Sequence, residues 1–255
     1  MLFRVVLLVV LLCGSASAQI VNVQGALAKA PENDGVSGEG SLKLSWREGN
    51  SPFFDIGGSG VALVRHGDFL ELGLVRGEYG RSRGLTLTEK TFEHLRERYT
   101  IDCRWRWEVF GQHEFDRFRR LNLRVVMGTG PALQIVNDEN FGLLAGVAYI
   151  FEIEHLDERE GTFDRGNETT AHRASFYLTG HEDIAKNVAI VETVYVQPRI
   201  DKPSDLRIFG ELSVQTKLSK HIALKDSLVI AYDDTPPDQV ERFDSAVEVA
   251  LLVSF

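Results

Sequence analysis

The most constraining feature of this chain is an alternation of apolar and polar residues, with a period of two, over unusually long stretches. Successive side chains of a strand point to opposite faces, so each phase marks one face. Strands of soluble sandwiches average about 5–6 residues, whereas these stretches exceed ten, which favours the wall of a barrel. The clearest apolar phase ends the chain: Phe243, Val247, Val249, Leu251, Val253 and Phe255.

The same alternation recurs between residues 121 and 135 and between residues 206 and 218. Past Ala18, no uncharged apolar stretch approaches the ~20 residues that a membrane-spanning helix needs. Any crossing of a membrane is therefore predicted to use strands. Counting back from the carboxyl end gives twelve predicted strands: 36–47, 53–65, 68–80, 86–100, 103–113, 120–136, 141–156, 171–184, 188–199, 205–218, 221–234 and 241–255.

The connections between these strands alternate in length. Tight turns are expected at 66–68, near Asp102, at 137–140, at 185–187 and at 219–221. Longer links fall between them, including Asp157–Thr170 and Asp233–Glu241. Short turns on one rim, long loops on the other and an even strand number are typical of bacterial outer-membrane barrels. The fold class predicted is all-β, an antiparallel transmembrane β-barrel of twelve strands over residues 36–255, with both ends on the periplasmic rim.

The first eighteen residues predict export. Arg4 precedes an apolar run from Val5 to Leu12, and Ala16-Ser17-Ala18 supplies small residues for a signal peptidase. The apolar run is too short to cross a bilayer. We therefore expect cleavage after Ala18, a periplasmic N-terminal segment over residues 19–35, and a location in the bacterial outer membrane. Cys103 is the cysteine retained after cleavage, and an exported thiol is expected to be buried or to face lipid.

Composition narrows the partners. The formal net charge is -9, which gives no electrostatic support for binding nucleic acid. The predicted partners are outer-membrane lipids and the barrel assembly machinery, and the oligomeric state stays open. No nucleotide-binding fingerprint or metal-protease motif occurs, and the acidic loops lack calcium-loop spacing, so neither a cofactor nor a metal is expected.

Several stretches carry a family resemblance. The alternating residues Val247, Val249, Leu251, Val253 and Phe255 resemble the carboxyl-terminal signal that directs outer-membrane barrels to insertion. Across residues 36–255 the chain resembles the salt-induced outer membrane protein family, domain-of-unknown-function family 481. The resemblance implies a barrel type and transfers no catalytic residue. It rests on Trp46–Ser51, Phe115–Phe118 with Leu121–Arg124, Asp201–Asp205 and Tyr232–Pro237.

Enzymatic motifs of barrel proteins are not found. Barrel lipases and lipid A deacylases place a histidine two residues before a nucleophilic serine, so that both share one face. None of the seven histidines has a serine at that position, and His172 and Ser175 are separated by an odd spacing. No Asp-His pair, as barrel proteases use, occurs either. The sequence predicts no catalytic residue and a protein that is not an enzyme.

Charged residues of the inward phase predict a ladder across the lumen. Pairing around the turn at 137–140 puts Arg124 opposite Glu152 or Glu154, with Glu108 expected on its other side. Arg173 is expected to approach both glutamates from the next strand. Such a ladder would narrow a twelve-stranded lumen, which predicts small or no conductance.

The function that follows is an envelope-structural role or a narrow small-solute channel. The alternatives are an outer-membrane barrel enzyme acting on lipid, a surface binding or adhesion protein without conductance, and a soluble periplasmic β-protein. One stretch departs from the pattern: from Thr91 to Arg98 both phases carry charge. The register of residues 86–100 is therefore open. A bulge and contact with a partner are two explanations, and a strand lying partly above the membrane is the simplest.

Overall fold

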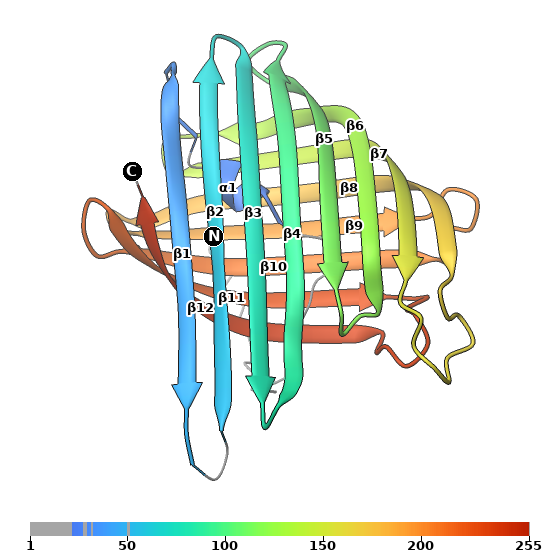
Figure 1. Ribbon diagram of the computed structural model, residues 1–255. Helices are drawn as coiled ribbons and strands as arrows, with labels where there is room; N and C mark the ends of the chain where they lie inside the picture. The colour runs from blue at the N-terminus through green and yellow to red at the C-terminus, as the bar shows by residue number, and fades with distance from the viewer. Residues whose placement is uncertain (1–21, 28–29, 32, 50–51, 255) are drawn as a thin grey trace, which may run out of the picture.

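The chain forms a closed barrel of twelve antiparallel strands, in which each strand pairs with its sequence neighbours and β1 meets β12 (Figure 1). This is a computed structural model, and it describes residues 22–27, 30–31, 33–49 and 52–254. The predicted signal peptide and Phe255 lie outside the described residues. The strands are β1 (Gly35–Arg47), β2 (Phe53–His66), β3 (Phe69–Ser82), β4 (Leu85–Thr100), β5 (Trp105–Asp116), β6 (Leu121–Asn137), β7 (Phe141–Leu156), β8 (Glu168–Ala185), β9 (Val188–Pro198), β10 (Leu206–Lys217), β11 (Ile222–Asp233) and β12 (Phe243–Ser254).

The predicted fold class is confirmed, and the longest connections all lie on one rim, although links 83–84 and 117–120 on that rim are short. Links 67–68, 101–104, 138–140, 186–187 and 218–221 share the rim that we name the short-turn rim. The opposite, long-loop rim carries 48–52, 83–84, 117–120, 157–167, 199–205 and 234–242. In Figure 1 the strands β1–β4 cross steeply over β9–β12 behind them, because strands in a closed barrel tilt against its axis.

The two faces of the wall follow the two phases of the sequence. On β12, Val247 and Val249 are 61% and 62% exposed on the outside, whereas Leu252, in the opposite phase, is 4% exposed and points inward. On β10, Arg207 and Phe209 of the inward phase are buried. Apolar side chains therefore form an outer band, and polar and aromatic side chains fill the interior.

Strand β4 resolves the ambiguous register. Phe92, His94, Arg96 and Arg98 are all buried, so this phase faces the lumen. The outward phase carries Glu93, whose carboxylate contacts the ring of His113 on β5. The register slips between Gly80 and Arg81 on β3, a bulge that realigns the two strands. The strand thus holds a bulge, one of the explanations of its pattern, and Arg96 and Arg98 point into the lumen. Whether β4 lies partly above the membrane stays a prediction.

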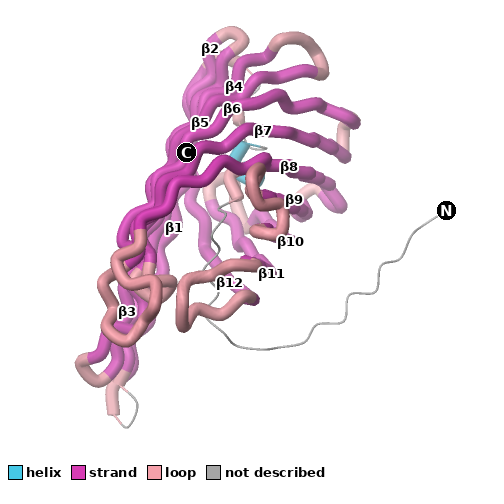
Figure 2. The backbone as a smooth tube through the Cα atoms, turned by 90° about the vertical axis from the view of Figure 1, so that its right-hand side faces the viewer, coloured by secondary structure: helices cyan, strands magenta, loops and turns pink. Residues whose placement is uncertain are grey.

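A short helix lies inside the barrel. Helix α1 (Gln24–Leu27) falls within the predicted periplasmic segment, and Val23 and Leu27 are buried against the inner wall (Figure 2). They pack with apolar side chains of three strands: Leu63, Leu70, Leu72, Leu74 and Phe92. Alternate leucines of β3 thus face this segment rather than water, which fills part of the lumen. Within the described ranges, no helix has the length and apolar character needed to cross a membrane.

Cys103 lies in the 101–104 turn of the short-turn rim and is exposed. The expectation of a buried thiol is therefore wrong, and the expectation that it faces lipid stays a prediction.

Candidate functional site in the barrel lumen

The inner wall near the long-loop rim carries a group of eight charged side chains, here named the Glu152 cluster. The alternation of β6 and β7 aims Arg124 and Glu154 inward, and the register places them directly opposite each other. Arg124 donates from Nε to Glu152 Oε2 at 3.1 Å and from Nη1 to Glu114 Oε2 at 3.1 Å. The members are Glu114, Arg124, Glu152, Glu154, Arg173, Asp205, Arg207 and Asp233.

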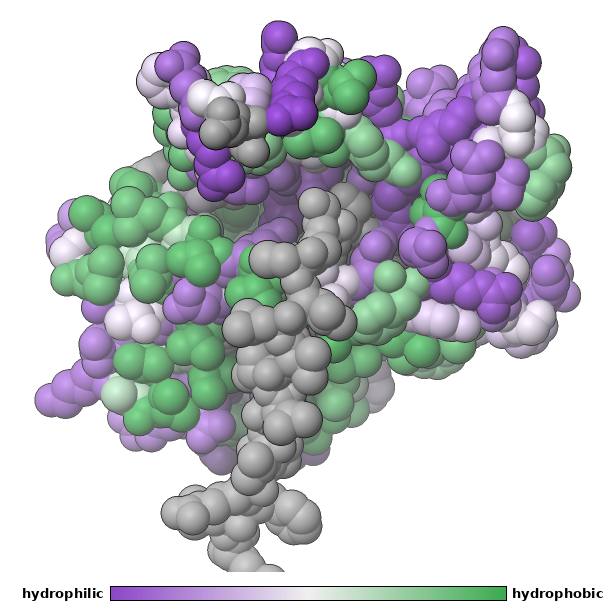
Figure 3. All heavy atoms as spheres, turned by 90° about the horizontal axis from the view of Figure 1, so that it is seen from below, coloured by the Kyte–Doolittle hydropathy of each residue, from purple (hydrophilic) through white to green (hydrophobic). Residues whose placement is uncertain are grey.

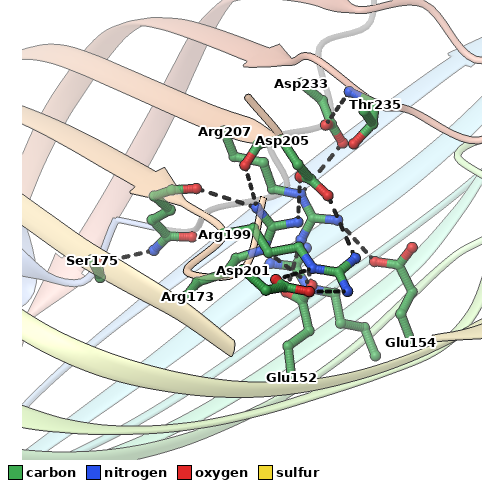
Figure 4. A network of polar contacts seen from close by, with 12 residues as sticks. Glu152, Glu154, Arg173, Ser175, Arg199, Asp201, Asp205, Arg207, Asp233 and Thr235 are labelled. Carbon is green, nitrogen blue, oxygen red and sulfur yellow. Dashed lines mark hydrogen bonds and ion pairs between the residues drawn. The ribbon is translucent and has the colours of Figure 1, made fainter. Parts of the chain in front are cut away.

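Glu152 is the centre of this cluster because three guanidinium groups converge on it. Arg207 Nη1 lies 2.7 Å from Glu152 Oε2, and Arg173 Nε lies 3.4 Å from Glu152 Oε1. Arg207 also reaches Glu154 at 3.2 Å and Asp233 at 3.4 Å (Figure 4). All these side chains are nearly inaccessible to solvent. Buried charges of this kind are tolerated only when each has a partner of opposite sign.

The cluster continues into the loop that joins β9 and β10. Arg173 Nη2 lies 2.8 Å from Asp205 Oδ1, and Arg173 Nη1 donates to the backbone carbonyls of Gln197 and Asp205. Arg199 lies at the edge, 2.7 Å from Asp201 and 3.8 Å from Asp205. The charged network therefore ties six strands, β5, β6, β7, β8, β10 and β11, to a loop of the long-loop rim.

The structure brings four of the five predicted ladder residues together, Arg124, Glu152, Glu154 and Arg173, and separates the fifth. Glu108 does not flank Arg124, because the β5–β6 register aligns Glu108 with Gly130 and aligns Glu114 with Arg124. The prediction for Glu108 is wrong by six residues, which corresponds to three inward positions along the strand.

Glu108 is the centre of a second group, the Glu108 cluster, nearer the short-turn rim. Its carboxylate lies 2.9 Å from Arg96 Nη1 and 2.6 Å from Arg98 Nη2, and it accepts a hydrogen bond of 2.9 Å from the hydroxyl of Tyr177. Arg98 also donates to Gln24 Oε1 of α1 at 3.0 Å. This contact links the inner helix to the charged wall.

A cavity lies between the two clusters. Its volume is about 20 Å³, and Arg96, Arg124 and Glu152 contribute to its wall. The rest of the lining mixes rings with neutral polar groups: His94, Phe110, Gln112, Val126, Ala148, Ile150, Ser175, Tyr177, Tyr195 and Gln197. The centre of the lumen is thus almost filled by side chains of mixed polarity, and charge networks constrict it on two sides.

The long-loop rim is held over the lumen by Arg120, which is fully buried. Its guanidinium donates to Asp157 Oδ1 at 2.9 Å, to Thr162 Oγ1 at 2.8 Å and to the carbonyl of Asp238 at 3.0 Å, and it also contacts the carboxylate of Asp164. Burial acts to raise the pKa of Asp164, but hydrogen bonds from the Asp238 amide and from Arg120 outweigh it and hold that pKa below its ordinary value. One side chain thus joins three loops.

Sequence reasoning missed Glu114, Arg207, Asp205 and Asp233. The first two lie in inward phases of the alternation, so a correct register would have found them. Asp205 and Asp233 lie at a strand boundary, where alternation carries no signal. Sequence reasoning also missed α1 and the role of Arg120.

His172 and Ser175, the nearest case to the histidine–serine motif of barrel enzymes, do not lie on the same face of β8. His172 is exposed on the outer face of β8, where its ring accepts a contact from Tyr149, and Ser175 is buried on the inner face. Among the described residues, no three His, Cys, Asp or Glu side chains are grouped so as to hold a metal ion.

Comparison with known proteins identifies the family and the fold. The model of the family described as "Protein of unknown function, DUF481" matches residues 42–255. A comparison with curated protein sequences finds no match. The barrel resembles the COG4313 outer membrane channel from Pseudomonas putida F1, with a TM-score of 0.54 and 10% identity over 89% of this chain and 97% of that one. It also resembles the translocator domain of the autotransporter NalP from Neisseria meningitidis, with a TM-score of 0.50 and 8% identity over 91% of each chain. At such identities the likeness extends to the fold alone.

Proposed function

Because the chain belongs to the DUF481 family, whose description names no function, we propose its role from the geometry of its lumen: a narrow, low-conductance barrel of the bacterial outer membrane, without catalysis. The observation that carries this proposal is the Glu152 cluster. Its arginines and carboxylates reach across from β5, β6, β7, β8, β10 and β11 and meet inside the barrel. Together with α1, they leave only a restricted path for a solute.

The location and the partners are part of the same proposal. The outer-membrane barrels that share this fold support an outer-membrane location. Cleavage after Ala18, insertion by the assembly machinery and contact with outer-membrane lipids follow from the sequence and are proposed with it. Residues 36–255 form the barrel unit in this proposal, preceded by the segment 19–35.

The experiment is conductance of the refolded protein in a planar bilayer, compared with the double variant Glu152→Ala/Glu154→Ala. Wild type is expected to show small or no steps. In the variant, Arg124 still has its ion pair with Glu114, and Arg173 still has its ion pair with Asp205, so neither arginine is left unpaired. Loss of two negative charges from the lumen should nevertheless raise conductance and shift selectivity toward anions.

The matched control is Glu158→Ala/Glu160→Ala, which removes the same charge from an exposed part of the 157–167 loop. It should leave conductance and selectivity at the wild-type level. A large, unselective wild-type conductance that neither double variant alters would contradict the proposal.

A further inference from the structure

The closed wall of the barrel has one short seam. Strands β1 and β12 pair through three residue pairs, Glu39 with Ser254, Gly40 with Val253 and Ser41 with Leu252. By contrast, β1 pairs with β2 through thirteen and β12 pairs with β11 through eleven. All three seam pairs lie toward the short-turn rim. Toward the long-loop rim the two strands diverge, as Figure 1 shows at the left edge of the barrel.

The unpaired parts of the two strands still belong to the apolar band. On β1, Leu44 and Trp46 are 64% and 72% exposed on the outer face, and on β12, Val247 and Val249 are similarly exposed. These segments are paired with β2 and β11 on their other sides, so they remain regular strands. Backbone groups that face an opening cannot remain unsatisfied in hydrocarbon. Polar groups must therefore occupy the opening and bind the free backbone groups of β1 and β12, while the outward side chains of these strands contact lipid.

Inward-phase side chains beside the opening are accessible, unlike those of the Glu152 cluster. The Lys43 side chain is 56% exposed although it reaches Asp55 at 2.9 Å and Glu78 at 3.2 Å inside the barrel. Glu248, in the inward phase of β12, is also exposed. The corresponding wall positions at Arg124 and Glu152 are 1% and 3% exposed. The view from below shows a hollow that is hydrophilic inside and bordered by apolar residues (Figure 3).

We propose that the gap between β1 and β12 is a lateral portal for a single-chain amphiphile, with the polar head among Lys43 and Glu248 and the acyl chain between Leu44 and Val249 in the bilayer. Both halves of such a molecule match the two sides of the gap, since the inner side is charged and the outer side is apolar. This proposal goes beyond conduction along the barrel axis and does not depend on it.

A single peptide strand fits the gap less well. Strands β1 and β12 run antiparallel to each other, so one inserted strand would have to be parallel to one of them. A hairpin or a pair of strands from a second copy would satisfy both edges, and the test includes that outcome.

The test places single cysteines in a Cys103→Ser background, with the protein in liposomes. The reporters are Lys43→Cys and Glu248→Cys, one on each side of the portal. If one of these variants does not fold, the other still tests the proposal. Leu44→Cys is the lipid-facing control, and Ser213→Cys is the control on the buried inner wall of β10. The probe is a maleimide carrying one acyl chain, added to the membrane.

Both reporters should react with the acyl maleimide within about threefold of the Leu44→Cys rate, while Ser213→Cys reacts at least about tenfold more slowly. Lysophosphatidylcholine should slow the reaction of both reporters with a small water-soluble maleimide by about fivefold or more, through occupancy of the portal. A Gly161→Cys variant in the exposed loop should not be protected.

Two results would overturn the proposal. One is labelling of the reporters by the water-soluble reagent alone while Leu44→Cys reacts with the acyl reagent, which means that the seam is sealed from lipid. The other is oxidative linkage of two chains through Leu44→Cys, with the reporters protected in the absence of amphiphile. That result would assign the gap to a second copy.

Discussion

Arg120 shows how far a single side chain can determine the order of a loop. The sequence predicts the stretch Asp157–Thr170 as a mobile tip, from its glycines and charges. In the structure Arg120 binds Asp157, Thr162 and Asp164 of this loop and the backbone of Asp238 in another. Removal of one partner from a buried ionic group leaves the others uncompensated. Arg120 is therefore expected to limit access to the loop.

We predict that Arg120→Gln makes cleavage of the loop by added protease roughly tenfold faster than in wild type, with the barrel still folded. The measurement is limited proteolysis at Arg159 and Arg165 on intact cells, which also reports whether the loop is extracellular. Lys220→Gln, in a short turn, is the control and should not change the rate. Equal rates for Arg120→Gln and wild type would show that the clamp does not order the loop.

The pKa of Asp164 gives the same clamp a pH dependence. Because the folded pKa lies below the ordinary value of 3.8, the carboxylate stabilises the loop fully above about pH 3.8, and this contribution is lost as pH falls through the depressed pKa. We predict rising cleavage of the loop by pepsin over that acidic range. Asp164→Asn should be cleaved faster than wild type above pH 3.8 and approach it at lower pH. A parallel pH profile for both would contradict the assignment.

At the scale of elements, the last strand decides whether the barrel closes. Its outward residues Val247, Val249, Leu251 and Val253 are exposed on the lipid face, as the apolar phase predicts. Phe255, the final residue of that phase, lies outside the described residues, and its role as part of an insertion signal stays a prediction. The short β1–β12 seam makes this end of β12 the place where closure occurs.

We predict that Phe255→Ser lowers the fraction of folded barrel in cells several-fold, because the apolar phase that the assembly machinery recognises is then cut short. The measurement is the heat-dependent shift of the folded form in detergent gels. Phe243→Ser, at the other end of the same phase, is the matched control and should assemble better. Full assembly of Phe255→Ser would show that the signal lies elsewhere.

For the whole molecule, orientation in the membrane is the property on which the other assignments depend. The start of β1 and the end of β12 both lie at the short-turn rim. Cys103 is exposed at the same rim. If this rim is periplasmic, a charged maleimide that does not cross the outer membrane should label Cys103 only after permeabilisation, by at least about tenfold over intact cells. Gly161→Cys in the Cys103→Ser background should react on intact cells. The opposite labelling pattern would show that the short-turn rim is extracellular.

The sequence by itself determined the class of fold, the strand number and the face of nearly every residue, because a period of two leaves one side of each strand apolar and a one-residue slip would expose it. Four ladder residues were identified for the same reason. Only the tertiary structure decided which inward charges meet. The pairing of Glu114 rather than Glu108 with Arg124 depends on register, which is set mainly by the position of the 117–120 loop, with β5 running to Asp116, and by a one-residue shift between Glu114 and Asp116.

Tertiary structure alone also decided the features that depend on residues far apart in the chain. Helix α1 has four residues, too few to show a helical period, and only the leucines of β3 reveal where it packs. The contacts of Arg120 reach residue 238, and the β1–β12 seam joins residues 39–41 to 252–254. Such contacts exist only in the closed wall, where charges and strand edges from distant segments need partners because water is largely excluded.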